Sequence, residues 1–238
     1  MFIARSGERL SLSSGQKRML YSTGSLRITG FRERPVQNTF FEQDKETGHI
    51  AVVFPGYGYR CFGPVIYYPT LVLLSLGADV LWVEYAYDRE PGYQDLPSAE
   101  RIEWLASDTS AATDVALEQR PYQRVTLVGK SLGTVAMGNL LVGDSRLRSA
   151  EAIWLTPLLR NPDLRVQLEQ LANPSLFVSG SADSQYDAAF AARIRKNPAS
   201  RFLLLEGADH GLEVRDDALR SLQILRRITE ATLEFLKG

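Results

Sequence analysis

A serine at position 131 is flanked by two glycines, in the run Gly129-Lys130-Ser131-Leu132-Gly133. The apolar run Val125–Val128 precedes it and small and apolar residues follow it, a pattern that predicts a strand, a sharp turn and a helix. In this context G-x-S-x-G forms a nucleophile elbow, a strained turn at positive φ that raises the serine hydroxyl above a sheet edge. A Cβ at either glycine would collide with the neighbouring strand or helix. Ser131 is therefore the candidate nucleophile, and the helix N-terminus beneath it suits a developing negative charge.

The same residues also resemble the end of a phosphate-binding P-loop, G-x-x-x-x-G-K-[ST]. The first glycine of that motif would stand at position 124, which is Arg124, and the loop between would be the apolar strand itself. We therefore exclude a nucleotide cradle.

A serine hydroxyl needs a base to remove its proton and a carboxylate to orient that base. The chain has only two histidines. His210 follows the predicted strand Phe202–Leu205, at the carboxyl end of a parallel sheet, where chemistry gathers. His49 precedes the predicted strand Ile50–Phe54 and so lies at the opposite end, about 16 Å away. His210 is the candidate base, although its Gly-Ala-Asp-His-Gly surroundings are also typical of a surface turn.

The carboxylate is expected after the strand that precedes the strand of His210. Leu176–Val178 leads into a turn in which Gly180 permits a tight bend and Asp183 follows at once. Asp187 lies near the start of the next predicted helix, where its other role is to cap that helix. Asp183 is the favoured candidate, Asp187 is the alternative, and the order along the chain is Ser, Asp, His.

These residues need a parallel sheet to bring them together, and the rest of the chain predicts one. Continuous apolar runs favour strands that are covered on both faces, and helical segments alternate with them, as in a doubly wound α/β domain. The predicted strands are Ile50–Phe54, Val80–Tyr85, Val125–Val128, Ala152–Leu155, Leu176–Val178 and Phe202–Leu205. The predicted helices are Val65–Leu76, Ala99–Glu118, Gly133–Val142, Pro162–Leu171, Ala188–Lys196 and Ala218–Leu236. Residues 1–35 are polar with short alternations such as Ser25–Thr29, which predicts one or two antiparallel edge strands.

Three motifs follow one another along the chain: the elbow, the turn Gly180–Asp183 that carries the candidate acid, and the turn Gly207–His210. In this order they resemble the motifs of the α/β-hydrolase superfamily. The resemblance covers residues from about 48 to the end and implies a single α/β-hydrolase domain over 1–238, with a mostly parallel twisted sheet and helices on both faces. It also implies an oxyanion hole built from the backbone N–H groups of Tyr57 and Leu132. In the loop that holds Tyr57, Pro55 stands where the family commonly has histidine.

The loop after the first predicted parallel strand continues with residues that could contact a substrate. Tyr59 and Phe62 are expected to line a short apolar pocket, and Arg60 is expected to pair with a carboxylate or phosphate of the substrate. The alternatives are aromatic core positions and an arginine paired at the surface. Cys61 is expected to be a bystander, because no second histidine is placed to activate it. Thr156–Asn173 has room for one helix, so no lid domain is expected.

Composition and charge limit the other classes of protein to which the chain could belong. The 238 residues are 45% hydrophobic and 23% charged with a formal net charge of -1, which is typical of a soluble globular protein and gives no reason to expect nucleic-acid binding. The single cysteine excludes an internal disulfide framework and a cysteine-rich metal site. No signal-peptide core is seen, and charges interrupt the most apolar region, Val65–Tyr85, so we expect a cytoplasmic protein without a membrane span. The oligomeric state stays open.

The sequence therefore predicts a serine hydrolase that cleaves a small ester or thioester through an acyl-enzyme, with no metal and no organic cofactor. Its partner would be a small-molecule acyl substrate. An acyltransferase that uses the same three residues, and a non-catalytic binding protein that keeps the fold, are the alternatives.

Overall fold

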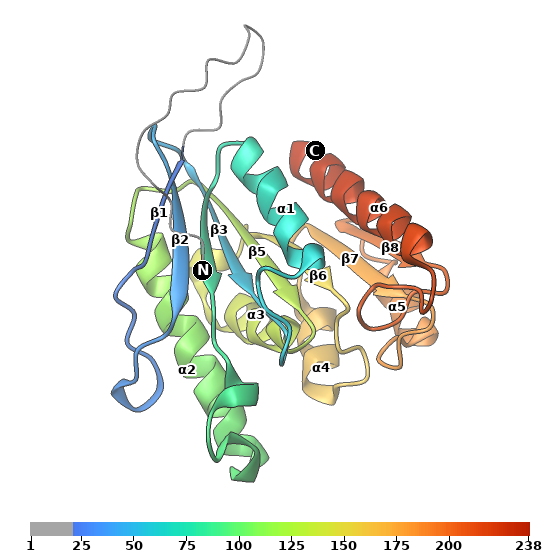
Figure 1. The fold of residues 1–238 in the computed structure, drawn as a ribbon, viewed down its shortest axis with the longest axis horizontal. Helices are drawn as coiled ribbons and strands as arrows, with labels where there is room; N and C mark the ends of the chain where they lie inside the picture. The colour runs from blue at the N-terminus through green and yellow to red at the C-terminus, as the bar shows by residue number, and fades with distance from the viewer. Residues whose placement is uncertain (1–20) are drawn as a thin grey trace, which may run out of the picture.

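The structure, a computed structural model, describes residues 21–238 and is built on an eight-stranded sheet with the order β1-β2-β4-β3-β5-β6-β7-β8 (Figure 1). β1 and β2 are antiparallel to their neighbours, and all pairs from β4 to β8 are parallel. The strands are β1 (Tyr21–Gly24), β2 (Asn38–Gln43), β3 (His49–Phe54), β4 (Asp79–Val83), β5 (Arg124–Lys130), β6 (Glu151–Leu155), β7 (Ser175–Gly180) and β8 (Ser200–Leu205).

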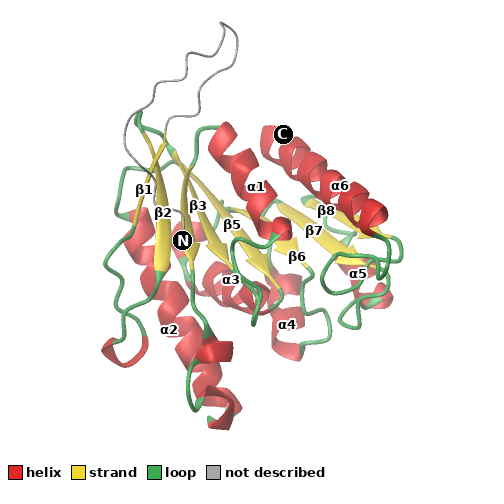
Figure 2. Cartoon of the chain, in the orientation of Figure 1, coloured by secondary structure: helices red, strands yellow, loops and turns green. Residues whose placement is uncertain are grey.

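Helices cover both faces of this sheet (Figures 1 and 2). α1 and α6 pack side by side on one face, and α2, α3, α4 and α5 lie on the other. The helices are α1 (Pro64–Ser75), α2 (Ser98–Leu117), α3 (Leu132–Gly143), α4 (Pro162–Gln170), α5 (Ala188–Ile194) and α6 (Ala218–Lys237). The described elements thus form one three-layered domain, and none of the helices in residues 21–238 is long and apolar enough to cross a membrane.

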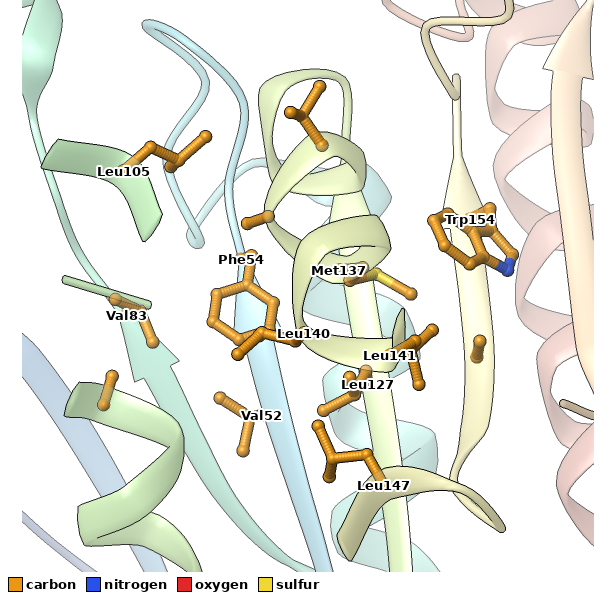
Figure 3. Close-up of a cluster of buried hydrophobic side chains, with 14 of the residues drawn as sticks. Val52, Phe54, Val83, Leu105, Leu127, Met137, Leu140, Leu141, Leu147 and Trp154 are labelled. Atoms are coloured by element: carbon orange, nitrogen blue, oxygen red, sulfur yellow. The ribbon is translucent and has the colours of Figure 1, made fainter. Parts of the chain in front are cut away.

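β3 and β4 are buried along their whole length, and β5 and β6 beyond their first residues, because helices cover the sheet from both sides. Alternate residues of β3 illustrate this: Val52 and Phe54 belong to the core beneath α2 and α3, whereas Ala51 and Val53 belong to the core beneath α1 and α6. Figure 3 shows Phe54 lying close to Met137 and Leu140 of α3, with Leu127 of β5 beside them. This packing holds α3 against β3 and β5.

Residues at the helix N-termini explain why several helices begin near the sheet edge where the strands end. Asn161 and Asp187 cap α4 and α5, because their side chains accept hydrogen bonds from Leu164 N and Phe190 N. Pro64 stands at the first position of α1, where its fixed φ suits the helix and its missing N–H costs nothing. The ends of these helices are therefore set by side chains in the sequence.

The predicted strands and helices are confirmed within a few residues, except at the antiparallel edge. Edge strands do occur, but they are β1 and β2, and β2 lies outside the predicted range 1–35. Ser25–Thr29 is not a strand: Ile28 is buried as part of a loop, and Phe31 N donates to the Asp108 carboxylate of α2. The apolar alternation there reflects a loop packed on a helix. Residues 1–20, included in that prediction, lie outside the described residues.

Candidate active site

Ser131 occupies the turn between β5 and α3 with φ 50° and ψ −111°, a left-handed conformation that a serine rarely adopts. The glycines on either side permit this turn. A Cβ on Gly129 would lie 2.6 Å from Gly133 O, and a Cβ on Gly133 would lie 2.1 Å from Phe54 O. Ser131 N donates to Leu155 O at 3.0 Å, which fixes the strained residue to the end of β6. The sharp strand–turn–helix geometry expected from the sequence is present.

Three of the sequence-predicted residues meet at this turn. His210 Nε2 lies 2.8 Å from Ser131 Oγ, and His210 Nδ1 lies 2.9 Å from both carboxylate oxygens of Asp183. The Asp183 side chain is 1% exposed and that of His210 is 37% exposed, so the carboxylate is shielded from water while the imidazole reaches the surface. When His210 carries its proton on Nδ1, that N–H donates to Asp183 and Nε2 accepts the Ser131 hydroxyl proton.

The turns after β7 and β8 must approach closely to make this contact. A Cβ on Gly180 would lie 2.0 Å from Ala208 O, so only glycine allows the two turns to pack together. Ala182 N donates to Ala208 O at 2.9 Å across the same gap. Asp183 Oδ1 also accepts from Gln185 N at 2.8 Å, which orients the carboxylate toward His210.

The alternative acid and the alternative histidine lie elsewhere. Asp187 caps α5 and forms an ion pair with Arg165, so it has the capping role and does not contact His210. His49 is buried at the start of β3, with its Nε2 2.9 Å from Thr126 Oγ1. Burial, together with the charge of Arg124, lowers the pKa of His49 to about 4, so it is neutral at pH 7.

The two backbone N–H groups that the resemblance implies for an oxyanion hole belong to Leu132, next to Ser131 in the chain, and to Tyr57, in the turn after β3. Leu132 is the first residue of α3, where the helix provides no acceptor for its N–H. Tyr57 lies in the tight turn after β3, closed by a bond from Tyr59 N to Gly56 O. A Cβ on Gly56 would lie 3.3 Å from Ser131 Cβ, so this turn runs directly beside the serine.

A stack of tyrosines joins this turn to the segment after β4. The ring centroids of Tyr85 and Tyr87, and those of Tyr87 and Tyr93, are 4.7 Å apart, and Tyr57 stacks on Tyr93 at 6.3 Å. Tyr85 also donates its hydroxyl to Pro55 O at 2.6 Å. The stack therefore fixes the turn that carries Tyr57 and extends into a wall beside Ser131.

A cavity of about 390 Å³ opens at Ser131 between α2 and α3. Its walls are largely apolar, with Arg101 and Asp163 as the charged groups. It is lined by Tyr57, Tyr93, Gln94, Ser98, Arg101, Ile102, Leu105, Ser131, Leu132, Val135, Asn139, Leu158, Asn161 and Asp163. Most of these residues were not predicted. The signal for them in the sequence was their position in the loops after the carboxyl ends of β4, β5 and β6, or on the helices that follow these strands.

The three residues predicted to bind substrate do not line this cavity. The Tyr59 hydroxyl accepts from Val65 N at 3.1 Å, and Arg60 forms an ion pair with Asp88 at 2.6 Å. Phe62 is 70% exposed and lies edge-on to Trp82, whose side chain faces α1. These contacts agree with the alternatives, which were aromatic packing positions and an arginine paired at the surface. Cys61 is buried, and burial raises the pKa of its thiol well above the usual range, which makes it inert.

No group of three or more His, Cys, Asp and Glu side chains suited to a metal ion occurs within residues 21–238. The groups of the candidate site are a hydroxyl, an imidazole and a carboxylate that contact one another in sequence, with two N–H groups and an apolar cavity beside them.

No protein-family model matches the chain, and a search of curated protein sequences gave no match. Solved structures do match. The esterase Pf2001 of Pyrococcus furiosus is 14% identical, with a TM-score of 0.69 over 92% of this chain and 93% of that chain. XC6422 of Xanthomonas campestris, described as an α/β serine hydrolase without lid, is 17% identical, with a TM-score of 0.65 over 90% and 94%. The dienelactone hydrolase of Anabaena variabilis is 19% identical, with a TM-score of 0.63 over 90% and 98%. The sheet order, the helical layers and these likenesses together show that the chain has the α/β-hydrolase fold.

Proposed function

We propose that this protein hydrolyses small carboxylic esters or thioesters through an acyl-enzyme on Ser131. The observation that carries the proposal is the chain of contacts from Ser131 Oγ to His210 Nε2 and from His210 Nδ1 to Asp183, at 2.8 and 2.9 Å. A serine, a histidine and a buried carboxylate linked in this order form an arrangement that supports acyl transfer to water. The esterase and hydrolase descriptions of the similar folds agree with it.

In the proposed reaction, His210 Nε2 accepts the Ser131 proton as Oγ attacks the carbonyl carbon. Asp183 holds the imidazole in the required tautomer and stabilises the imidazolium that forms. The same imidazolium then donates its proton to the leaving group, whose bond to the carbonyl carbon breaks. A water molecule, deprotonated by His210, attacks the acyl-enzyme in the second half, and Ser131 recovers its proton as the acid leaves. The reaction requires no cofactor.

Two features favour this chemistry over simple binding. The N–H groups of Tyr57 and Leu132 would donate to the oxyanion of the tetrahedral intermediate, and such donors are each worth about 3–4 kcal/mol in other acyl-transfer enzymes. The cavity of about 390 Å³ would take a small apolar acyl or alcohol group. The segment Thr156–Asn173 contributes only α4 and short loops to its rim, so the expectation of a site without a lid domain is kept in the proposal.

The test is the rate of p-nitrophenyl butyrate hydrolysis by the wild type and by Ser131→Ala. We expect kcat to fall about 10⁴-fold or more in the variant, with its melting temperature close to that of the wild type because alanine keeps the Cβ and the backbone of the turn. Retention of most of the activity would contradict the assignment of Ser131. Adding methanol or another small alcohol distinguishes a hydrolase from an acyltransferase: an acyltransferase would form mainly the transferred ester.

A further inference from the structure

Lys130, the residue before the candidate nucleophile, is 2% exposed, which is unusual for lysine. It ends β5, and its side chain extends toward the α1 and α6 side of the sheet. Its Nζ donates to the backbone carbonyl of His210 at 3.0 Å and to Thr156 Oγ1 at 3.3 Å. The Tyr59 ring lies beneath the ammonium, with its centroid 4.5 Å from Nζ. One ammonium therefore links the loops that follow β3, β6 and β8.

Burying an ammonium costs free energy unless opposite charges and hydrogen bonds compensate for it. Burial lowers the pKa of Lys130 to about 8, and the carboxylates of Asp183, Asp209 and Glu213 act in the opposite direction. The charged or titratable groups that face Lys130 are Tyr59 from the loop after β3, Asp183 from the loop after β7, and Asp209, His210 and Glu213 from the loop after β8. An apolar side chain would fill this position without the cost of desolvation, so the ammonium has a role beyond filling space.

We propose that Lys130 is a positioning residue: its ammonium holds the main chain of His210, and thereby keeps the imidazole between Ser131 and Asp183. This inference rests on the proposed function, because it assigns a purpose to the position of His210. Lys130 does not line the cavity beside Ser131, so it acts through His210 and does not bind substrate. The tether is needed because the His210 side chain is 37% exposed and its loop has no helix or strand to hold it.

The first test is Lys130→Met, which keeps an unbranched side chain of similar length and removes the charge. The free energy of a hydrogen bond with one charged partner corresponds to a factor of about 10 to 100 in a rate or equilibrium constant. We expect kcat for p-nitrophenyl butyrate to fall by about that factor, with KM within about twofold of the wild type. The melting temperature is expected to fall moderately, because Met fills the space of the lysine side chain but leaves His210 O without its donor.

A control variant separates positioning from general destabilisation. Ile228→Ala removes a buried side chain from α6, in the same core but away from the elbow. We expect Ile228→Ala to lower the melting temperature at least as much and to leave kcat unchanged, so that a loss of stability alone would not account for a lower kcat in Lys130→Met. If kcat of Lys130→Met stays within about twofold of the wild type, the proposal is overturned.

The pH profile provides a second test that does not depend on how Lys130→Met folds. As the pH rises through about 8, the ammonium loses its charge and the bond to His210 O becomes a neutral one of roughly half the strength. We expect kcat of the wild type to fall over this range, after subtraction of spontaneous hydrolysis. Lys130→Arg keeps its charge at every accessible pH, so it is expected to lose this decline. A decline near pH 8 that is the same in Lys130→Arg, or a wild type without any decline, would overturn the proposal.

The His210 Nδ1 proton gives a readout that needs no turnover. In the wild type we expect a sharp downfield proton resonance from the bond to Asp183, assigned against the only other histidine, His49. Lys130→Met is expected to broaden or remove it, and an unchanged resonance would count against the proposal. This result stands even if no ester is hydrolysed, so failure of the proposed function and failure of the Lys130 inference are distinguishable.

Discussion

Replacing Asp183 by asparagine changes one oxygen of a buried carboxylate into an amide nitrogen. In the native protein, Oδ1 accepts from Gln185 N at 2.8 Å, and both oxygens lie 2.9 Å from His210 Nδ1. An amide has only one oxygen, and Gln185 N is a part-buried donor that requires it. The new NH₂ group then faces Nδ1 and donates to it.

A donor at Nδ1 forces the imidazole proton onto Nε2, the nitrogen that must accept the Ser131 proton. The same change of tautomer in a characterised serine protease lowers kcat by about 10⁴-fold, which corresponds to about 5 kcal/mol at 25 °C. We expect a decrease of this size for Asp183→Asn with p-nitrophenyl butyrate. KM is expected to stay close to the wild-type value, because Asp183 does not line the cavity.

Asp187→Asn is the matched control, because it makes the same chemical change four residues along the chain. Asparagine can still cap α5 through its oxygen, and the ion pair lost with Arg165 is partly exposed, where such pairs contribute little. We expect kcat of this variant within about twofold of the wild type. The opposite ranking of the two variants would refute the reasoning and identify Asp187 as the orienting carboxylate.

Two more predictions follow from the cavity and from the buried histidine. Each methylene that fits the cavity of about 390 Å³ contributes about 0.8 kcal/mol until the space is filled, so kcat/KM is expected to be higher for p-nitrophenyl acetate or butyrate than for the decanoate or palmitate, without interfacial activation. A steady rise to long chains would disprove the short pocket. Because the pKa of His49 is lowered to about 4 in the native protein, its contribution to stability is present above pH 6.5 and is lost as the pH falls toward 4. The difference in free energy of unfolding between wild type and His49→Gln is therefore expected to change by about 3 kcal/mol from pH 7 to pH 4, measured by urea denaturation, and a constant difference would contradict it.

The site residues on strand ends could be predicted from the sequence because the topology brings the carboxyl ends of parallel strands to one edge. Ser131, Asp183 and His210 each follow a continuous apolar run, so the parallel topology places all three at the same edge of the sheet. The cavity wall could not be predicted in this way. Tyr93 and Gln94 lie in an irregular segment with two short 3₁₀ turns, whose course depends on tyrosine stacking rather than on periodicity.

The antiparallel edge was located only in part, because β1 lies within residues 1–35 whereas β2 does not. β2 has only Phe40 and Phe41 as apolar residues, one facing each core, so it lacks both the long apolar run and the alternation that mark a strand. Ile28 and Phe31 nearby are apolar because a loop packs on α2. Short apolar pairs at a sheet edge and buried loops give the same sequence signal, and only tertiary contacts separate them.

The most direct test of the proposed function is covalent labelling by a fluorophosphonate probe, read by intact mass and then by peptide mapping. We predict one adduct per chain, on the peptide that contains Ser131, with no adduct in Ser131→Ala and a much slower reaction in His210→Gln. Such labelling requires a serine whose proton is removed by a base, which a binding protein with the same fold has no reason to retain. An unlabelled wild type, or an adduct on any other residue, would contradict the account.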